Sequence, residues 1–94
     1  MDVAGFENQL RAEGFGEIET KSLSPGTHNH AHHHPFDVKA LVLDGQITLT
    51  VGSEARTYRA GDVFTMASGC DHVEDIGTGG VRYCVGRRRS AGKP

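Results

Sequence analysis

The sequence predicts an all-β domain, and three observations support this expectation. Seven or eight short segments of strand-like composition follow one another at regular spacing. Glycine supplies 13 of the 94 residues, mostly at the turns expected between these segments. Five of the six histidines fall within residues 28–34, in a stretch that also favours extended backbone. Short strands joined by glycine-rich turns are typical of an antiparallel barrel or sandwich.

The two ends of the chain are expected to lie outside the β-domain. Phe6 and Leu10 are spaced as on one face of a helix, so residues 1–16 should form a short amphipathic N-terminal helix and its lead-in. Residues 17–87 should form the barrel. Residues 88–94 contain Arg88, Arg89 and Lys93 and no acidic residue, and should form a basic, disordered tail.

The strand segments are identified by period-two alternation and by the turn residues between them. In chain order they cover residues 17–23, 28–34, 37–44, 46–51, 55–59, 63–66, 72–76 and 81–85. An Asp-Gly pair between alternating segments indicates a tight hairpin at residues 42–46. The glycine-rich residues 77–80 are expected to join the last two strands in the same way.

Residues 26–35, GTHNHAHHHP, form the candidate functional segment. In an extended strand His28, His30, His32 and His34 line one face and His33 points to the other. A row of imidazoles on one face is a metal-site candidate, and His72 could complete it from a neighbouring strand. The alternatives are an expression tag, which would lie at a terminus, and a solvated loop that binds no ion.

Composition and charge exclude several classes of function. The formal net charge is −2, and no apolar run approaches the roughly 18 residues of a membrane span. No charged-then-apolar leader suggests secretion, so a cytoplasmic location is expected. Arg87, Arg88, Arg89 and Lys93 cluster at the end of the chain, but no basic face or aromatic platform accompanies them. Nucleic acid is therefore not an expected partner.

The two cysteines are expected to be free thiols. Cys70 and Cys84 do not form a CxxC pair, and a reducing compartment disfavours a disulfide. Cys84 lies in an apolar run, which favours buried packing. Cys70 is two residues before His72 and is a minor candidate for a metal ligand.

Two motifs carry a resemblance to a known family. The pattern G-x5-H-x-H-x3,4-E-x6-G is matched at Gly26, His32, His34 and Gly45. The pattern G-x5-P-x-G-x2-H-x3-N is matched at Gly61, Gly69 and His72. With these motifs the chain resembles a small single-domain cupin of the RmlC-like type, over roughly residues 17–87. The resemblance implies a double-stranded β-helix, or jelly-roll barrel, with a metal inside.

The sequence departs from the family pattern at three positions. Val38 stands where the family has its glutamate ligand, Ala67 replaces the proline and Ile76 replaces the asparagine. Asp37 is adjacent to the vacant glutamate position, but a one-residue slip in a strand turns a side chain to the other face. Asp37 could reach the metal only through a bulge after residues 35–36.

The resemblance implies that His32, His34 and His72 bind a divalent transition metal ion, commonly Fe, Mn, Ni, Cu or Zn. Three imidazoles are, independently of the family, ligands suited to such ions, whereas Mg and Ca prefer oxygen. A neutral three-histidine set leaves coordination positions open for substrate or water.

Glu74 is the candidate catalytic residue, because it lies two positions after His72 and shares its strand face. It could be a fourth ligand, an acceptor that orients an imidazole, a general base, or only a carboxylate at the solvated rim. His30 and His28 share the ladder face and could supply a fourth nitrogen or a proton relay. Val38, Ala40 and Val42 are expected to give the pocket a small apolar lining.

Three functions are compatible with these features. The first is a metal-dependent enzyme, of oxygenase (including dioxygenase), isomerase or lyase type, acting on a small organic molecule. The alternative is a non-catalytic module that binds or senses a small ligand or the metal itself; the third is a scaffold that binds nothing. A homodimer is expected for all three, because the barrel leaves sheet edges and apolar strand faces such as Leu41 and Leu43 to cover.

Overall fold

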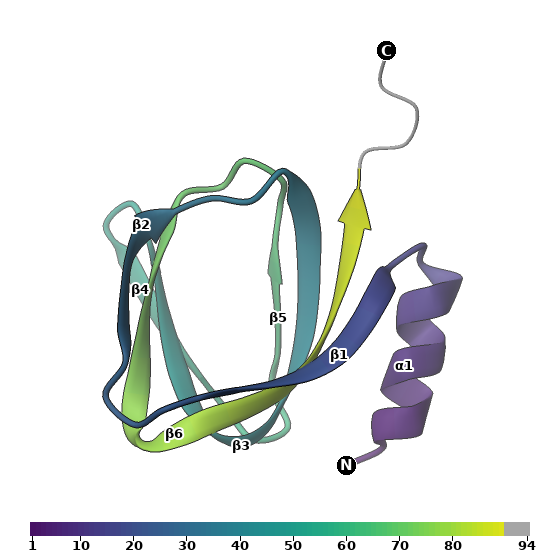
Figure 1. The fold of residues 1–94 in the computed structure, drawn as a ribbon, viewed down its shortest axis with the longest axis horizontal. Helices are drawn as coiled ribbons and strands as arrows, with labels where there is room; N and C mark the ends of the chain where they lie inside the picture. Colours follow the sequence, from purple (N-terminus) through teal and green to yellow (C-terminus); the bar gives the residue numbers. More distant parts are fainter. Residues whose placement is uncertain (90–94) are drawn as a thin grey trace.

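The computed structural model describes residues 1–89, which form a β-barrel with one helix against its outer wall (Figure 1). The elements in chain order are α1 (Val3–Ala12), β1 (Gly16–Leu23), β2 (His28–His32), β3 (Phe36–Val51), β4 (Glu54–Arg59), β5 (Val63–Met66) and β6 (His72–Arg89). All strand pairs are antiparallel. The predicted all-β class with an N-terminal helix is confirmed. In the described part of the chain, no helix is long and apolar enough to cross a membrane.

The long strands β3 and β6 are shared by two sheets. They pair along most of their length, from Phe36 opposite Arg89 to Thr50 opposite Val73. In one sheet the first half of β3 and the second half of β6 lie between β5 and β1. In the other sheet the second half of β3 and the first half of β6 lie between β4 and β2. This is the predicted jelly roll, with its interior between the two sheets.

The structure corrects both predicted hairpins. Residues 42–46 do not reverse the chain, because β3 runs without interruption through them and stays paired with β6. Residues 77–80 likewise lie within the continuous strand β6. The pairing register of β3 shifts at Val42/Asp44 and again at Gly45/Ile47. An Asp-Gly pair serves a β-bulge as well as a hairpin, and here it bends the strand from one sheet into the other.

Gly45 and Gly80 form the close contact at which β3 and β6 bend together. Both have positive φ angles, of 74° and 77°. A Cβ atom added to Gly45 would lie 2.0 Å from the carbonyl oxygen of Gly80. Only glycine adopts this conformation without strain and leaves room for the neighbouring backbone. The second glycine of the first motif therefore has a packing role.

We predict that Gly45→Ala destabilises the fold far more than Gly52→Ala. Gly52 also has a positive φ angle, of 61°, but nothing lies within 4 Å of an added Cβ, so its substitution should cost roughly 1–2 kcal/mol of conformational strain. At Gly45 the overlap with Gly80 adds to this strain, and the total should exceed roughly 3 kcal/mol. Urea denaturation of both variants measures the difference. Equal losses would contradict the packing role of Gly45.

The helix α1 covers the outer face of the sheet, in a core separate from the barrel interior. Its N-terminus is capped by Asp2, which accepts a hydrogen bond from the Gly5 N–H at 2.8 Å. The apolar residues of this outer core are Phe6, Leu10, Phe15, Leu41 and Cys84, with Val3, Ile18 and Leu43 at its edge. The apolar face that suggested a dimer is therefore covered by the protein's own helix.

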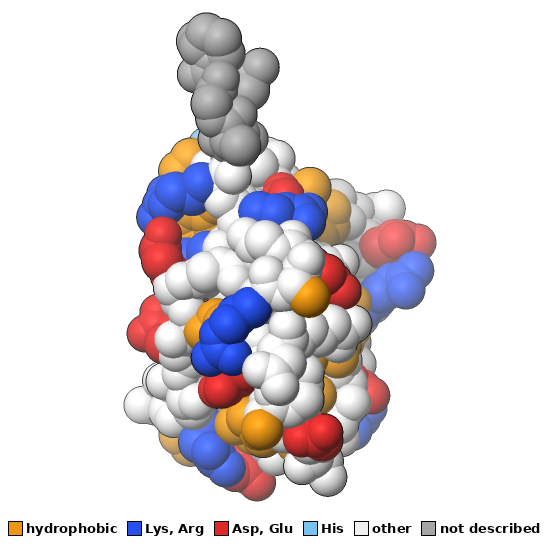
Figure 2. Space-filling model, turned by 90° about the vertical axis from the view of Figure 1, so that its right-hand side faces the viewer, with side chains coloured by type: hydrophobic (Ala, Val, Ile, Leu, Met, Phe, Trp, Pro, Cys, Tyr) orange, Lys and Arg blue, Asp and Glu red, His pale blue; other side chains and the backbone are white. Residues whose placement is uncertain are grey.

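The arginines at the end of β6 are paired with acidic side chains. Arg87 binds Glu19 at 2.7 Å, Arg88 binds Asp37 at 3.0 Å and Arg89 binds Glu17 at 2.9 Å. On the face seen in Figure 2, basic and acidic side chains accordingly lie next to one another. The strand β6 continues to Arg89, two residues beyond the expected end of the barrel. The remainder of the predicted tail, residues 90–94, lies outside the described residues.

Candidate metal centre

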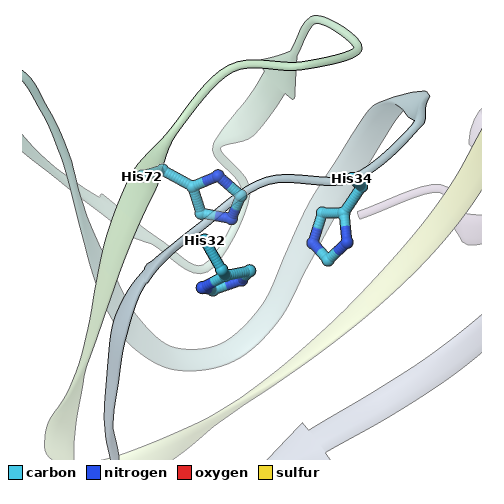
Figure 3. Close-up of side chains that lie close together, drawn as sticks. All are labelled: His32, His34 and His72. Atoms are coloured by element: carbon cyan, nitrogen blue, oxygen red, sulfur yellow. The ribbon is translucent and has the colours of Figure 1, made fainter.

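Three histidines from the two motif segments converge inside the barrel (Figure 3). His32 is the last residue of β2 and lies directly opposite His72, the first residue of β6. His34 follows in the short connection to β3. One ring nitrogen from each histidine can be chosen so that all three lie within 4.8 Å of one another. The spacing predicted from the sequence thus corresponds to a group of nitrogens that could hold a metal ion.

Backbone carbonyls fix the tautomer of two of these rings. His32 Nδ1 lies 2.6 Å from the carbonyl oxygen of His30, and His72 Nδ1 lies 3.0 Å from that of Cys70. A carbonyl oxygen only accepts, so in both rings Nδ1 carries the hydrogen and donates it. In the neutral form of both rings, Nε2 is then the nitrogen without a hydrogen, and this is the atom through which such an imidazole can bind a metal ion.

His34 is held by its backbone and by a neighbouring ring. Its carbonyl accepts a hydrogen bond from the Gly69 N–H at 2.9 Å, and its imidazole stacks on Phe36 with ring centroids 5.0 Å apart. Burial lowers the pKa of His34, and the nearby His32 and His72 lower it further. The neutral ring is thereby favoured, and only the neutral ring is a ligand.

The donor set fits a transition metal ion. His72 is only 2% exposed, and its Nε2 atom is buried without a hydrogen-bond partner among the described residues. Buried polar atoms of this kind are rare, because leaving one unpaired costs roughly 1–3 kcal/mol. An ion bound between the three rings would satisfy this atom. Three nitrogen donors suit Zn, Cu, Ni or Fe better than Mg or Ca.

Glu74 lies beside the three rings and not at the solvated rim. Its Oε2 atom is 3.4 Å from His72 Nε2 and 3.8 Å from His32 Nε2. Its side chain is only 12% exposed, and Asn29 donates a hydrogen bond to Oε1 at 2.7 Å. One carboxylate oxygen is thus fixed by Asn29 while the other faces the imidazoles. This arrangement provides a carboxylate suited to a fourth ligand or to proton transfer.

Asp37 does not take the place of the missing family glutamate. Its carboxylate accepts a hydrogen bond from the Ser68 N–H at 2.8 Å and pairs with Arg88 at 3.0 Å. The Ser68 hydrogen bond, and after it Arg88, lowers the pKa of Asp37. Val38, by contrast, is buried and lines the interior. The strand alternation therefore turns Asp37 away from the three histidines.

The other histidines of the ladder do not join the three-histidine group. His28 lines the interior cavity, but its Nδ1 atom pairs with the exposed Asp75 carboxylate. His30 lines the same cavity with its ring edge-on to His28, at a centroid distance of 5.0 Å. His33 points outward and pairs with Asp71 at 2.9 Å. The predicted division of faces is confirmed, although the register shifts within β2 between Asn29 and His32.

The cysteines have separate surroundings. Cys84 is fully buried in the outer core, as expected, and burial raises the pKa of its thiol. The Cys70 thiol lies 3.7 Å from the carbonyl oxygen of Asp71, and Cys70 is not part of the group that could hold a metal ion.

A cavity of about 450 Å³ opens beside the histidines. Its lining mixes apolar residues with ionisable ones, and is more polar than predicted. Of the residues expected to line it, Val38 does so, whereas Ala40 and Val42 are buried in the core and do not. The full lining comprises Lys21, Leu23, His28, Asn29, His30, His32, His34, Phe36, Val38, Phe64, Met66, Glu74, Tyr83, Val85 and Arg87.

Sequence reasoning missed Asn29, Lys21 and Arg87 as residues of the site. Lys21 alternates in phase with Leu23 on β1, so strand periodicity contained a signal for its inward direction. The role of Asn29 depends on its pairing with Glu74 across β2 and β6. Such a register between distant segments leaves no local signal in the sequence.

Comparison with solved structures reveals the same fold in proteins of low sequence identity. A protein of unknown function from Rhizobium leguminosarum has 18% identity and a TM-score of 0.73, with 78% of this chain and 69% of that chain covered. A cupin superfamily protein from Desulfitobacterium hafniense has 18% identity and a TM-score of 0.69, covering 78% and 66%. An oxalate oxidase structure has 23% identity and a TM-score of 0.65, covering 77% and 41%. The chain thus spans about two thirds of the first two structures and less than half of the third.

The comparison with curated proteins gave no match. The cupin domain family, however, matches residues 20–76, which is more than half of the chain and contains both motif histidine groups. The jelly-roll fold, the two motifs of glycine and histidine residues, and this match all indicate the same family. The protein therefore belongs to the cupin family.

Proposed function

We propose that this cupin binds one divalent transition metal ion through ring nitrogens of His32, His34 and His72, and is an enzyme that acts on a small organic molecule in the adjoining cavity. The observation that carries the proposal is the buried Nε2 atom of His72, which has no hydrogen-bond partner among residues 1–89 and faces two further imidazoles. A bound ion of this kind supplies Lewis acidity and open coordination positions. The candidates are Fe, Mn, Ni, Cu and Zn.

Glu74 supports an enzyme in preference to a site that only stores metal. Its Oε2 atom faces the imidazoles, while Asn29 fixes Oε1 at 2.7 Å. A carboxylate held in this way can take a proton from a bound substrate and return it at another atom. Proton transfer beside a Lewis acid suits isomerase or lyase chemistry. An oxygenase or dioxygenase would require a redox-active metal, so the identity of the ion decides between these classes.

The alternative function is a non-catalytic cupin that binds or senses a small ligand or the metal. The cavity of about 450 Å³ is as suitable for this role as for catalysis. The two functions differ in what they require of Glu74. With an enzyme, Glu74→Gln should bind the metal more weakly but still take it up at saturating concentration, and the metal-loaded variant should lose turnover. With a binding module, the metal-loaded wild type would leave a broad panel of small molecules unchanged.

A cytoplasmic homodimer remains our proposal for the state of the protein in the cell. Cys70 and Cys84 are free thiols, which is typical of a reducing compartment. The strands β1 and β4 are at the two ends of the strand order β1-β6-β3-β4. A second copy that covers the edge of one of these strands would form the dimer. Elution as a monomer in size-exclusion chromatography would contradict the dimer.

We predict about one equivalent of transition metal per chain in untagged protein purified without added metal or chelator. His34→Ala should lose this metal, because one of the three nitrogens is removed. Elemental analysis measures both. His33→Ala is the matched control, since His33 lies in the same segment but pairs with Asp71 on the outside, and it should keep the metal. A folded wild type that takes up none of the five metals would overturn the proposal.

We further predict that Asn29→Ala weakens metal binding about tenfold, because Glu74 loses the hydrogen bond that orients it beside the imidazoles. Competition with a chromophoric chelator measures the dissociation constant. His33→Ala again serves as the control. An unchanged affinity in Asn29→Ala would exclude a contribution of the Asn29–Glu74 pair to the metal site.

A further inference from the structure

The wall of the cavity formed by β1 and β6 contains polar groups that the three histidines and Glu74 do not use. Lys21 on β1 lies directly opposite Tyr83 on β6 in the antiparallel register. Side chains at opposite positions of such a pair project to the same face of the sheet. Both residues line the cavity, as do their neighbours on that face, Leu23 and Val85. Lys21 and Tyr83 therefore project from one wall into the space beside the metal centre.

Lys21 is a half-buried cation without an acidic partner. Among residues 1–89, the carboxylate ion pairs of Lys and Arg side chains are made by Arg11, Lys39, Arg56, Arg82, Arg87, Arg88 and Arg89, and none is made by Lys21. Arg87, the other cation of the cavity, is neutralised by Glu19 at 2.7 Å and lies over the Phe36 ring at 5.6 Å. Lysines are rarely buried unless they are paired, because their charge loses hydration. The Lys21 charge is thus available to an anion in the cavity.

Tyr83 provides a second donor on the same wall. It is only 7% exposed, and its hydroxyl makes no hydrogen bond within the described part of the chain. Burial, followed by the nearby Glu74 carboxylate, raises the pKa of Tyr83 to about 12. The phenol therefore keeps its hydrogen at neutral pH and can donate it to an oxygen.

The charges of the cavity select the ligand. Lys21 and Arg87 contribute two positive charges and Glu74 one negative charge, and Glu19 compensates Arg87 from outside. These four charges sum to zero, but Glu74 lies beside the imidazoles of His72 and His32, and among residues 1–89 no carboxylate is within ion-pair distance of Lys21. Lys21 is therefore the cation of the cavity that is not paired locally, apart from any charge on a metal ion. A single cation beside a phenol matches a singly charged oxyanion. The lining next to this pair is apolar at Leu23 and Val85, and Phe36 of β3 adds a further apolar side chain to the cavity.

We propose that Lys21 and Tyr83 form an anion subsite that binds the carboxylate of a small organic acid, with the apolar body of the acid against Leu23 and Phe36. The inference rests on the proposed function in that the acid is the molecule presented to the metal centre. The subsite itself belongs to β1 and β6 and does not require the ion. The substrate class that follows from this subsite is a small monocarboxylate with an apolar body.

The test compares acids with neutral amides of the same shape. Benzoate and benzamide, and hexanoate and hexanamide, are titrated into the protein by calorimetry, both metal-free and loaded with Zn²⁺. Wild type should bind each acid at least about tenfold more tightly than its amide, because the hydrogen bond from Lys21 is charge-assisted. This preference should appear in the metal-free protein as well.

Three variants isolate the contribution of Lys21. Lys21→Met keeps an unbranched side chain of nearly the same length without the charge and should abolish the preference for acids, whereas Lys21→Arg should retain it. Arg56→Met is the control, because it removes the same charge from an exposed side chain outside the cavity. It should leave the preference unchanged.

The outcomes separate this inference from the proposed function. A preference for acids that requires Zn²⁺ and survives in Lys21→Met would place the carboxylate on the metal; it would overturn the subsite and leave the metal centre intact. Equal binding of acids and amides by wild type, or no binding of either, would also overturn the subsite. A protein that takes up no metal but still loses its acid preference in Lys21→Met would support the subsite and refute the metal centre.

Discussion

The antiparallel pairing of β3 with β6 is the interaction on which the rest of the structure depends. The two strands remain paired while both bend, so each contributes one half to either sheet. The bend requires the backbones to approach at Gly45 and Gly80, where no side chain could be accommodated. The four shorter strands then add to the edges of this pair. Without the bend the two sheets would not face each other, and no interior would exist.

The site follows from this arrangement in two separate ways. Long-range pairing places β2 beside the first half of β6. As a result His32 lies opposite His72, although the two residues are 40 positions apart in the sequence. The direction of each ring is then fixed locally, since the carbonyl that binds Nδ1 comes from a residue only two positions away. The sheet thus determines where the histidines are, and the strand around each histidine determines how its ring faces.

Much of this site could be predicted because strand geometry is periodic. Period-two alternation was enough to separate His33 from His32 and His34, and to associate Glu74 with His72. The bends could not be predicted, because Asp44-Gly45 is equally suited to a turn and to a bulge, and the outcome depends on the contact with Gly80. The covering of Leu41 by α1 and the hydrogen bond from Asn29 to Glu74 also depend on distant packing. The local sequence pattern does not predict contacts between segments that are far apart in the sequence.

The buried His72 Nε2 atom, which has no hydrogen-bond partner in the described part of the chain, has a consequence for the stability of the whole protein. The folded chain without an ion bears the desolvation cost of this buried atom, which the unfolded chain avoids in water. An ion that binds only the folded state would remove this cost and add stability by mass action, about 2.7 kcal/mol when its free concentration is a hundredfold above the dissociation constant. A domain of this size has little stability in reserve. The fraction of molecules that escape degradation would then follow the supply of metal in the cell, so that the amount of protein would itself report on that supply.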